Sequence, residues 1–160
     1  MRLLSALLAA AGLLALVPSA HSAPPALCTA SVIEATLTGA GKDLGGVGVD
    51  LIRCGDVTGD GATDAVFTVA SGGTAGDTHF GVIEGSGDGG EVVLYKSAYQ
   101  VGIARHDKRS FDILQPFYRA KDPNCCPSSF RQTRYTWTGS KFKAGKAKKL
   151  KTAPKRFYRA

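Results

Sequence analysis

The chain has 160 residues, of which 44% are hydrophobic and 21% are charged, a balance close to that of an ordinary soluble globular protein. This composition excludes an intrinsically disordered chain. The 20 glycines follow no collagen-like repeat and indicate many tight turns instead, and the formal net charge is +7.

The N-terminus has the pattern of a secretory signal peptide. Arg2 precedes an apolar run over residues 3–17, and Pro18 ends any helix there. This run is shorter than the ~20 residues that a transmembrane helix needs. We therefore expect a signal peptide over residues 1–22, with cleavage just before or just after Ala23, and a secreted protein without a transmembrane span.

The four cysteines are Cys28, Cys54, Cys125 and Cys126. In an exported chain an even number of cysteines predicts structural disulfides, here two. A bond between Cys125 and Cys126 would close a small strained ring, so we expect each of them to pair with Cys28 or Cys54. Zinc or redox chemistry is the alternative, but no Cys-x-x-Cys is present and no histidine lies at ligand spacing from a cysteine.

Residues 31–39 have the features of a short helix, with a strand as the alternative. Ser31 and Glu34 have the spacing of a capping box, and Gly39 is a suitable end. A glycine-rich loop over residues 38–48 follows.

From residue 49 onward the pattern is that of successive β-hairpins, because short runs rich in branched and aromatic residues alternate with glycine clusters. The sequence predicts strands at 49–52, 65–70, 78–83, 91–95, 102–105, 110–118 and 130–138, and a short return through Phe142 after a turn at Gly139. Alternation within 130–138 places Trp137 on a covered face. The predicted fold is one α+β domain over residues 23–142, an antiparallel β meander with one or two short N-terminal helices. An all-β sandwich is the alternative.

Residues 56–64 have the spacing of a calcium loop. Side-chain oxygens stand at positions 1, 3, 5 and 9, and glycine stands at position 6, where the backbone turns sharply. The predicted ligands are Asp56, Thr58, Asp60, Asp64 and the carbonyl of Ala62. The loop resembles the D-x-x-G-D-G-x-x-D turn of FG-GAP and VCBS repeats, which joins two strands and binds calcium.

The glutamate that an EF-hand has at position 12 is absent, since Phe67 stands there and a strand follows. The expected affinity for Ca²⁺ is therefore weak, with a dissociation constant of ~10⁻⁴ to 10⁻³ M. The alternative is a metal-free turn in which the carboxylates accept hydrogen bonds from backbone N–H groups.

Charge is unevenly distributed along the chain. All 13 acidic residues lie between Glu34 and Asp122, whereas residues 131–159 contain eleven Lys and Arg and no acid. We expect residues 143–160 to be a basic, disordered tail that is attracted to anionic surfaces or folds back on the acidic body. The candidate residues for binding anionic surfaces are Lys141, Lys143, Lys146, Lys148, Lys149, Lys151, Lys155, Arg156 and Arg159.

A second resemblance covers residues 50–142. The segment 54–61, the run Asp-Pro-Asn-Cys-Cys-Pro-Ser at 122–128 and the aromatic strand ending at Gly139 are similar to actinobacterial exported proteins of the LppP/LprE lipoprotein type. This resemblance implies a fold and an exported location but no reaction. The chain lacks a lipobox before Cys28, so the resemblance does not extend to a membrane anchor.

Motifs for catalysis are weak. Residues 85–87 are too short for a nucleophile elbow, and no phosphate-binding loop precedes a helix. We expect a secreted, non-catalytic binding or envelope-associated module, monomeric, whose partners are anionic envelope polymers or acidic glycans and not nucleic acid. The alternative is a small exported hydrolase or inhibitor-like protein that uses the loops at 77–79 and 106–109, with a serine such as Ser71 completing a trio with Asp77 and His79.

Overall fold

The computed structural model describes residues 26–87 and 89–158, so the predicted signal peptide lies outside the described residues. A 3₁₀ turn (η1, Ala26–Cys28) and one α-helix (α1, Ala30–Gly39) precede the strands. No helix in this part of the chain is long and apolar enough to cross a membrane. The described strands are β1 (Gly48–Cys54), β2 (Ala65–Ala70), β3 (Asp77–Ser86), β4 (Gly89–Ser97), β5 (Gly102–Asp107), β6 (Ser110–Phe117), β7 (Ser129–Trp137), β8 (Phe142–Ala144) and β9 (Lys148–Leu150).

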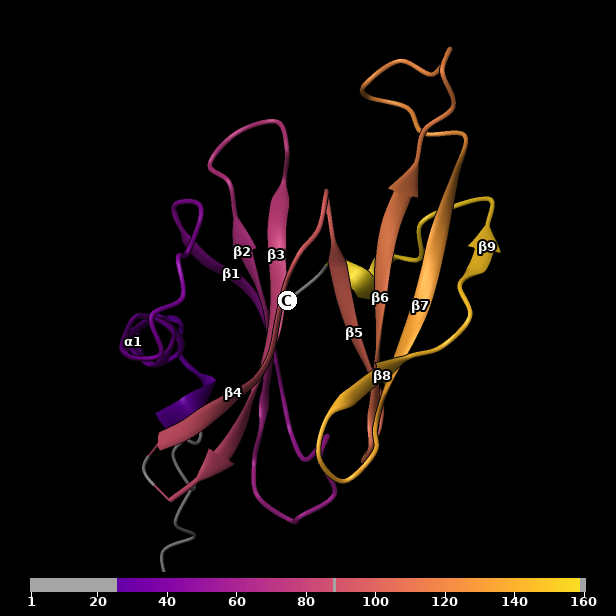
Figure 1. Cartoon of the computed structure of the whole chain (residues 1–160). Coiled ribbons are helices and arrows are strands. Elements are labelled where there is room, and N and C mark those ends of the chain that lie inside the picture. The colour runs from indigo at the N-terminus through magenta and orange to yellow at the C-terminus, as the bar shows by residue number, and fades with distance from the viewer. Residues whose placement is uncertain (1–25, 88, 159–160) are drawn as a thin grey trace, which may run out of the picture.

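The strands form two antiparallel sheets (Figure 1). The first has the order β1-β2-β3-β4, and the second has the order β5-β6-β7-β8, with β9 also pairing with β7. Each sheet is a meander, because strands that follow one another from β1 to β4 and from β5 to β8 are hydrogen-bonded antiparallel neighbours. The predicted α+β class with an antiparallel meander is confirmed.

The two sheets share one apolar core. Val66 and Phe80 from the first sheet pack with Phe111 and Tyr135 from the second, and the ring centroids of Phe80 and Tyr135 are 5.3 Å apart. Trp137 is half-buried against this cluster. The architecture thus also contains the face-to-face sheet packing of the alternative prediction, with a helix added outside it.

Each sheet is covered on its outer face by a different end of the chain. Ile33 and Leu37 of α1 pack on Phe67 and Val69 of the first sheet. On the second sheet, Phe157 of a short 3₁₀ turn (η2, Lys155–Phe157) is 0% exposed. The molecule therefore has four layers, since helix, sheet, sheet and C-terminal segment follow one another.

The predicted helix exists, but the predicted capping box is wrong. Thr29 is the N-cap residue and makes no side-chain cap hydrogen bond. Glu34 accepts a hydrogen bond from the backbone N–H of Val49 at 2.8 Å through its Oε1. The carboxylate is used to satisfy the edge of β1 and hold α1 against it, so it is not available to the helix start.

The predicted disulfide pairing is also wrong. The structure pairs Cys28 with Cys54 and Cys125 with Cys126. Cys28 in η1 lies beside the end of β1, with 6.0 Å between the Cα atoms of the bonded pair. The loop that carries Cys125 and Cys126 extends from the far end of β6 and β7, well away from η1 (Figure 1). Geometry therefore allows that loop a bond between neighbours only.

Residues 143–158 form β-structure and a packed turn, so the predicted disordered tail is wrong for this part of it. Leu150 pairs with Phe130 across β9 and β7, and Leu150, Ala153 and Phe157 join the cluster on the outer face of β5 and β6. The basic charge of this segment predicted a solvated tail. The segment is ordered instead, because it pairs with the edge of β7 and buries a few well-spaced apolar residues. The predicted domain boundary at residue 142 is accordingly not seen.

Candidate functional site

The acidic loop between β1 and β2 is built on its own carboxylates. Asp56 accepts hydrogen bonds from the backbone N–H groups of Gly59 (2.5 Å) and Gly61 (3.2 Å), and Asp60 accepts one from Ala62 (2.8 Å). Gly61, at the position where the sequence requires a sharp turn, has a φ of 90°. The loop thus has the Asx-turn geometry of the metal-free alternative.

Asp64 anchors this loop to the rest of the first sheet. Its Oδ2 accepts hydrogen bonds from the N–H groups of Val57 (2.7 Å) and Thr58 (2.9 Å) and from the Thr58 hydroxyl (3.1 Å). Its Oδ1 accepts the N–H of Gly85 on β3 at 3.0 Å. Because the side chain is 0% exposed and its two oxygens receive four hydrogen bonds, Asp64 has a structural role that the sequence pattern did not indicate.

The same loop brings three carboxylates close enough to hold a cation. One ligand oxygen from each of Asp56, Asp60 and Asp64 lies within 4.8 Å of the others. Glu84 on β3 adds negative charge beside them, and burial followed by the charges of Asp60 and Asp64 raises the pKa of Glu84. Of the other predicted ligands, the Thr58 hydroxyl donates to Asp64, and Ala62 is held in the loop through its N–H, which donates to Asp60. The donor set, oxygen from carboxylates, is the one that hard cations prefer.

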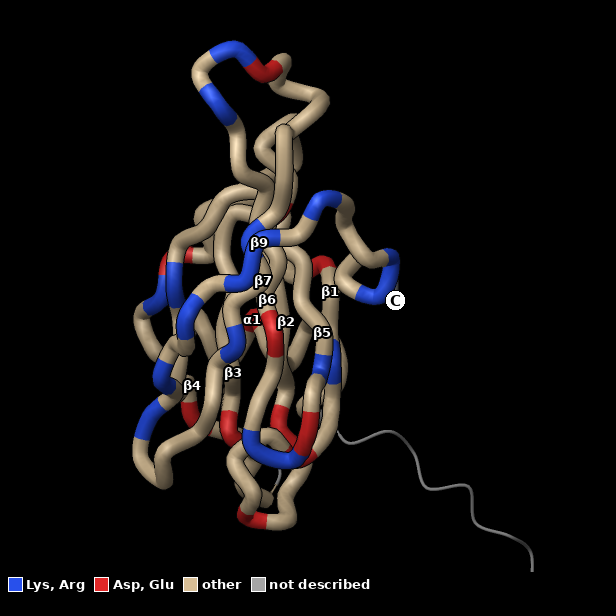
Figure 2. Tube along the Cα trace, turned by 90° about the vertical axis from the view of Figure 1, so that its right-hand side faces the viewer, with Lys and Arg blue, Asp and Glu red and all other residues tan. Residues whose placement is uncertain are grey.

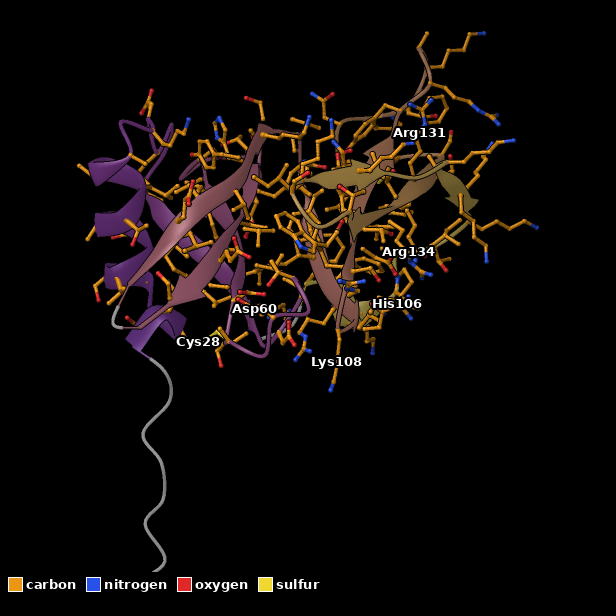
Figure 3. The ribbon with its side chains drawn as sticks, turned by 60° about the horizontal axis from the view of Figure 1, so that its bottom comes forward. Cys28, Asp60, His106, Lys108, Arg131 and Arg134 are labelled. Carbon is orange, nitrogen blue, oxygen red and sulfur yellow. A yellow bond between two sulfur atoms is a disulfide. The ribbon has the colours of Figure 1, made fainter. Side chains whose placement is uncertain are left out.

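The acidic loop lies against the hairpin formed by β5 and β6. Arg105 on β5 donates a hydrogen bond to the carbonyl of Cys54 at 2.9 Å, and the Arg109 side chain lies beside Gly59. Figure 3 shows Asp60 and Lys108 at this same end of the molecule. The positive charges of these two arginines partly offset the negative charge of the acidic loop. Their contacts also fix the position of the loop relative to the second sheet.

At the opposite edge of the second sheet the charge is positive. We define the cationic edge as Arg131 of β7 together with the lysines in and around β8 and β9, namely Lys143, Lys146, Lys148, Lys149 and Lys151. All six side chains are exposed. Figure 2 shows the basic residues following β9 and the chain beyond it. Among the described residues, no carboxylate forms an ion pair with any of these six side chains.

Pairing of β9 with β7 sets the register of the cationic edge. Lys149 lies opposite Arg131, and Lys148 lies opposite Gln132. Since successive side chains on a strand point to opposite faces, Lys148 and Lys149 flank the edge on its two sides. The remaining predicted cations are elsewhere: Lys141 follows β7, Lys155 and Arg156 lie in η2, and Arg159 is outside the described residues.

A shallow cleft lies on each side of the cationic edge. The cleft of about 310 Å³ is lined by Arg134, Lys146 and Lys148 among others, and Arg134 there is paired with Asp112 at 2.9 Å. The cleft of about 230 Å³ on the other side is lined by Phe117, Ser129, Arg131 and Lys149, with the Arg131 guanidinium 4.1 Å from the centroid of the Phe117 ring. Arg131 and Arg134 are both labelled in Figure 3.

The residues of the hydrolase alternative are not brought together. On β3, Asp77 accepts a hydrogen bond from the hydroxyl of Thr68, whereas the ring of His79 stacks on Tyr95 with 5.3 Å between centroids. Regular alternation would put Asp77 and His79 on one face, but the register of β2 and β3 shifts between Val69 and Ala70. Tyr95 packs with the cluster under α1, whereas Thr68 lies opposite Phe80 of the core between the sheets, so Asp77 and His79 are on different sides of the sheet. Among the described residues, the polar partners of His106 in the other proposed loop are Asp107, Asp112 and Arg134, and none of them is a serine or a cysteine.

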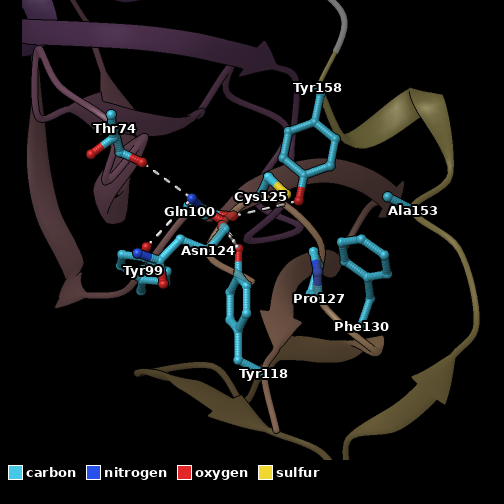
Figure 4. Close-up of a pocket in the computed structure, with 10 residues that line it drawn as sticks. All are labelled: Thr74, Tyr99, Gln100, Tyr118, Asn124, Cys125, Pro127, Phe130, Ala153 and Tyr158. Carbon is cyan, nitrogen blue, oxygen red and sulfur yellow. Dashed lines mark hydrogen bonds between the residues drawn. The ribbon is translucent and has the colours of Figure 1, made fainter. Parts of the chain in front are cut away.

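A larger pocket, of about 670 Å³, was not indicated by any sequence pattern (Figure 4). It lies where the linker between the two sheets meets the Cys125–Cys126 loop and the C-terminal segment. Its rings come from Tyr99, Tyr118, Phe130 and Tyr158, which are far apart in the sequence and follow no common spacing. The number of tyrosines in the sequence does not show where a pocket would form. Only the folded C-terminal segment brings them to one place.

Comparison of the chain with protein-family models, with curated proteins and with solved structures finds no match. The functional argument therefore rests on the geometry of the cationic edge, the acidic loop and the aromatic pocket.

Proposed function

We propose that this chain is an exported, non-catalytic module that binds anionic polymers of the cell envelope through the cationic edge. The observation that carries the proposal is an ordered row of cations that have no acid partner among the described residues. A single exposed lysine changes the stability of the fold very little. Several lysines held in one array create a local positive potential that attracts polyanions. The Cys28–Cys54 disulfide is consistent with export.

The strand geometry suits a repeating ligand. Lys146 precedes β9 and lines the same cleft as Lys148, so these two lysines present neighbouring positive charges on one side of the edge. Lys149 lies opposite Arg131 and forms a pair with it on the other side. A flexible chain of phosphate or carboxylate groups can contact both sides, and each contact adds a small, salt-sensitive contribution.

The flanking clefts supply more than charge. Ser129 is 1% exposed, and its hydroxyl has no hydrogen-bond partner among the described residues. It lines the same cleft as Arg131 and Lys149. A buried donor without a partner is unusual in proteins, and beside two cations it favours an oxygen-rich anion as the group that approaches.

The proposed partner can be tested by cosedimentation with purified cell wall. The mature full-length protein should sediment with wall at about 50 mM salt and be released at about 500 mM, because the higher ionic strength shortens the Debye length to a few ångströms. Wall stripped of its anionic polymers should retain little protein. Retention that does not depend on salt or on those polymers would contradict the proposal.

A matched pair of variants separates the cationic edge from net charge. Lys148→Ala with Lys149→Ala removes two charges from the edge, and Lys42→Ala with Lys96→Ala removes two from the loop after α1 and from β4. Retention on wall at low salt should fall several-fold for the first double variant and stay close to that of the parent for the second.

As a second part of this proposal, the acidic loop binds Ca²⁺ weakly. With a dissociation constant of ~10⁻³ M, ~10 mM calcium would stabilise the fold by about 1.4 kcal/mol and raise the melting temperature by a few degrees. Asp56→Asn with Asp60→Asn should abolish the rise, because two of the three clustered carboxylates lose their charge. Equal melting temperatures with and without calcium in the parent protein would leave the loop as a turn held by hydrogen bonds.

The likeness to LppP/LprE proteins remains a prediction. It agrees with an exported module of this kind, but the proposal on the cationic edge does not depend on it.

A further inference from the structure

We propose that the aromatic pocket of Figure 4 binds a neutral sugar unit of a saccharide, with the sugar ring packed against tyrosine and its hydroxyls bound by side-chain amides. This site is separate from the cationic edge, and the inference stands whether or not the edge binds polyanions. It goes beyond the proposed function because it assigns a second ligand class to a different part of the molecule.

The chemistry of the pocket lining favours a neutral ligand. None of the side chains that line it is charged, although 21% of the chain's residues are. Four aromatic rings supply apolar faces, and Gln100 and Asn124 supply amides. A pyranose ring has a face of C–H groups and a rim of hydroxyls, so it needs flat rings beside donors and acceptors. The volume of about 670 Å³ lies within the range of small-molecule sites.

Gln100 has a conformation that its local sequence does not favour. Its φ is 48°, and it is the one non-glycine residue with a positive φ within residues 26–87 and 89–158. Such a backbone costs free energy and persists where its surroundings hold it. Its N–H donates to the carbonyl of Ala75 at 3.2 Å, and Gly76 leaves room for its side chain. This position aims the amide into the pocket.

The Gln100 amide is oriented before any ligand arrives. Its Oε1 accepts a hydrogen bond from the Tyr118 hydroxyl at 2.9 Å, and its Nε2 donates to the carbonyl of Thr74 at 3.2 Å. Nε2 also donates to the Tyr99 hydroxyl at 3.5 Å, so one lone pair of Oε1 remains for a ligand. A polar group held in this way loses little entropy on binding, which is the usual advantage of a preformed site.

Two exposed groups complete the site. Tyr99 and Tyr158 are 44% and 42% exposed, which is high for rings of this size and leaves faces open to a ligand. The Tyr158 hydroxyl donates to the backbone carbonyl of Gln100 at 3.4 Å. Partial burial of the phenol group and then the charge of Asp77 raise the pKa of Tyr158 to about 12, so this hydroxyl stays neutral. The Cys125–Cys126 bond links neighbouring residues on the rim of the pocket and restricts the loop that carries Asn124.

The test is a ¹⁵N NMR titration of the full mature protein with three neutral trisaccharides: cellotriose, maltotriose and triacetylchitotriose. At least one should shift the resonances of residues 99, 100, 118 and 124 in a saturable way. The affinity should be unchanged when salt is raised from about 50 to about 500 mM, because no charge takes part. Failure of all three to cause saturable shifts there, or shifts confined to β7 and β9, would overturn the inference.

Variants make the test independent of folding. Tyr99→Ala should weaken binding about tenfold, whereas Tyr99→Phe, which keeps the ring, should bind within about twofold of the parent. Gln100→Gly removes the amide together with the unfavourable backbone conformation, so the melting temperature should stay level or rise while affinity falls at least about tenfold. Parent-like affinity of Gln100→Gly would overturn the role given to this residue. Lys148→Ala with Lys149→Ala should leave the trisaccharide affinity unchanged, which keeps this result distinct from that of the proposed function.

Discussion

The acidic loop and the cationic edge carry opposite charges and use them in opposite ways. In the loop, Asp64 alone accepts four hydrogen bonds from the protein itself. At the edge, the exposed lysines have no acid partner among the residues that the structure describes. Strand β9 is held there by its pairing with β7 and by the apolar contacts of Leu150. Charges met within the fold stabilise it, whereas unmatched charges remain available to a ligand.

The largest expected effect concerns the apolar anchor of the basic segment. Phe157→Ala should lower the free energy of unfolding by about 4 kcal/mol, because Phe157 is 0% exposed and lies against Ala104 and Leu114. Chemical denaturation measures this change. Phe157→Leu, which keeps most of the apolar volume, should cost less than about 1.5 kcal/mol. A parent-like stability of Phe157→Ala would mean that charge, and not packing, holds the segment.

A slightly smaller loss is expected when the acidic loop is cut from the sheet. Asp64→Ala leaves the N–H groups of Val57, Thr58 and Gly85 without their acceptor and should cost about 3 kcal/mol. Asp60→Ala is the matched control, because Asp60 is exposed and accepts a single N–H. It should cost less than about 1 kcal/mol. Similar losses for the two variants would contradict the structural role of Asp64.

Asp77 differs from Asp64, because it is a buried carboxylate that, among the described residues, accepts a hydrogen bond from the Thr68 hydroxyl and none from a backbone N–H. Burial, and then the nearby charge of Asp50, raise the pKa of Asp77 in the folded protein, although the hydrogen bond from Thr68 opposes this. The folded state therefore binds a proton there more tightly than the unfolded chain does. The charged form costs stability above the folded pKa, and this cost disappears as the pH falls below the ordinary value of 3.8.

Asp77→Asn should accordingly raise the stability at pH 7, since the buried charge is removed and the amide oxygen still accepts from Thr68. The gain should vanish near pH 3, where the parent carboxyl is protonated. Thermal unfolding of both proteins at the two pH values measures the difference. A melting temperature at pH 7 that is lower for the variant would show that the charge stabilises the fold.

The smallest expected effect on stability is at the cationic edge. Lys148→Ala with Lys149→Ala should change the free energy of unfolding by less than about 0.5 kcal/mol, because both side chains are exposed and unpaired among the described residues. Urea denaturation is sufficient to measure this. A loss comparable to that of Asp64→Ala would mean that the lysines are structural after all.

Much of the fold could be predicted from local pattern. Every predicted strand is present, and residues 65–70 match β2 exactly in both bounds, because alternation and glycine turns are short-range signals. The predicted helix over 31–39 agrees with α1 to within one residue, although its predicted capping is wrong. Glu34 bonds to Val49, fifteen residues away, and no spacing within the helix encodes that contact.

In the candidate sites, too, contacts within one short segment could be predicted, whereas contacts between distant segments could not. The spacing of Asp56, Asp60 and Asp64 predicted that their oxygens come together, because a single tight loop carries them. The cysteine pairing and the order of residues 143–158 depend on which segments meet across the sandwich, and four cysteines or a run of lysines do not contain that information. The aromatic pocket was even less predictable from the sequence, because Tyr99, Tyr118 and Tyr158 come from three segments that meet after folding.

The most direct test of the central claim is elution from immobilised heparin, an acidic glycan, in a salt gradient. The parent protein and Lys42→Ala with Lys96→Ala should elute at nearly the same salt concentration, and Lys148→Ala with Lys149→Ala should elute at a clearly lower one. Equal shifts for the two double variants would show that net charge alone, and not the cationic edge, determines binding to polyanions.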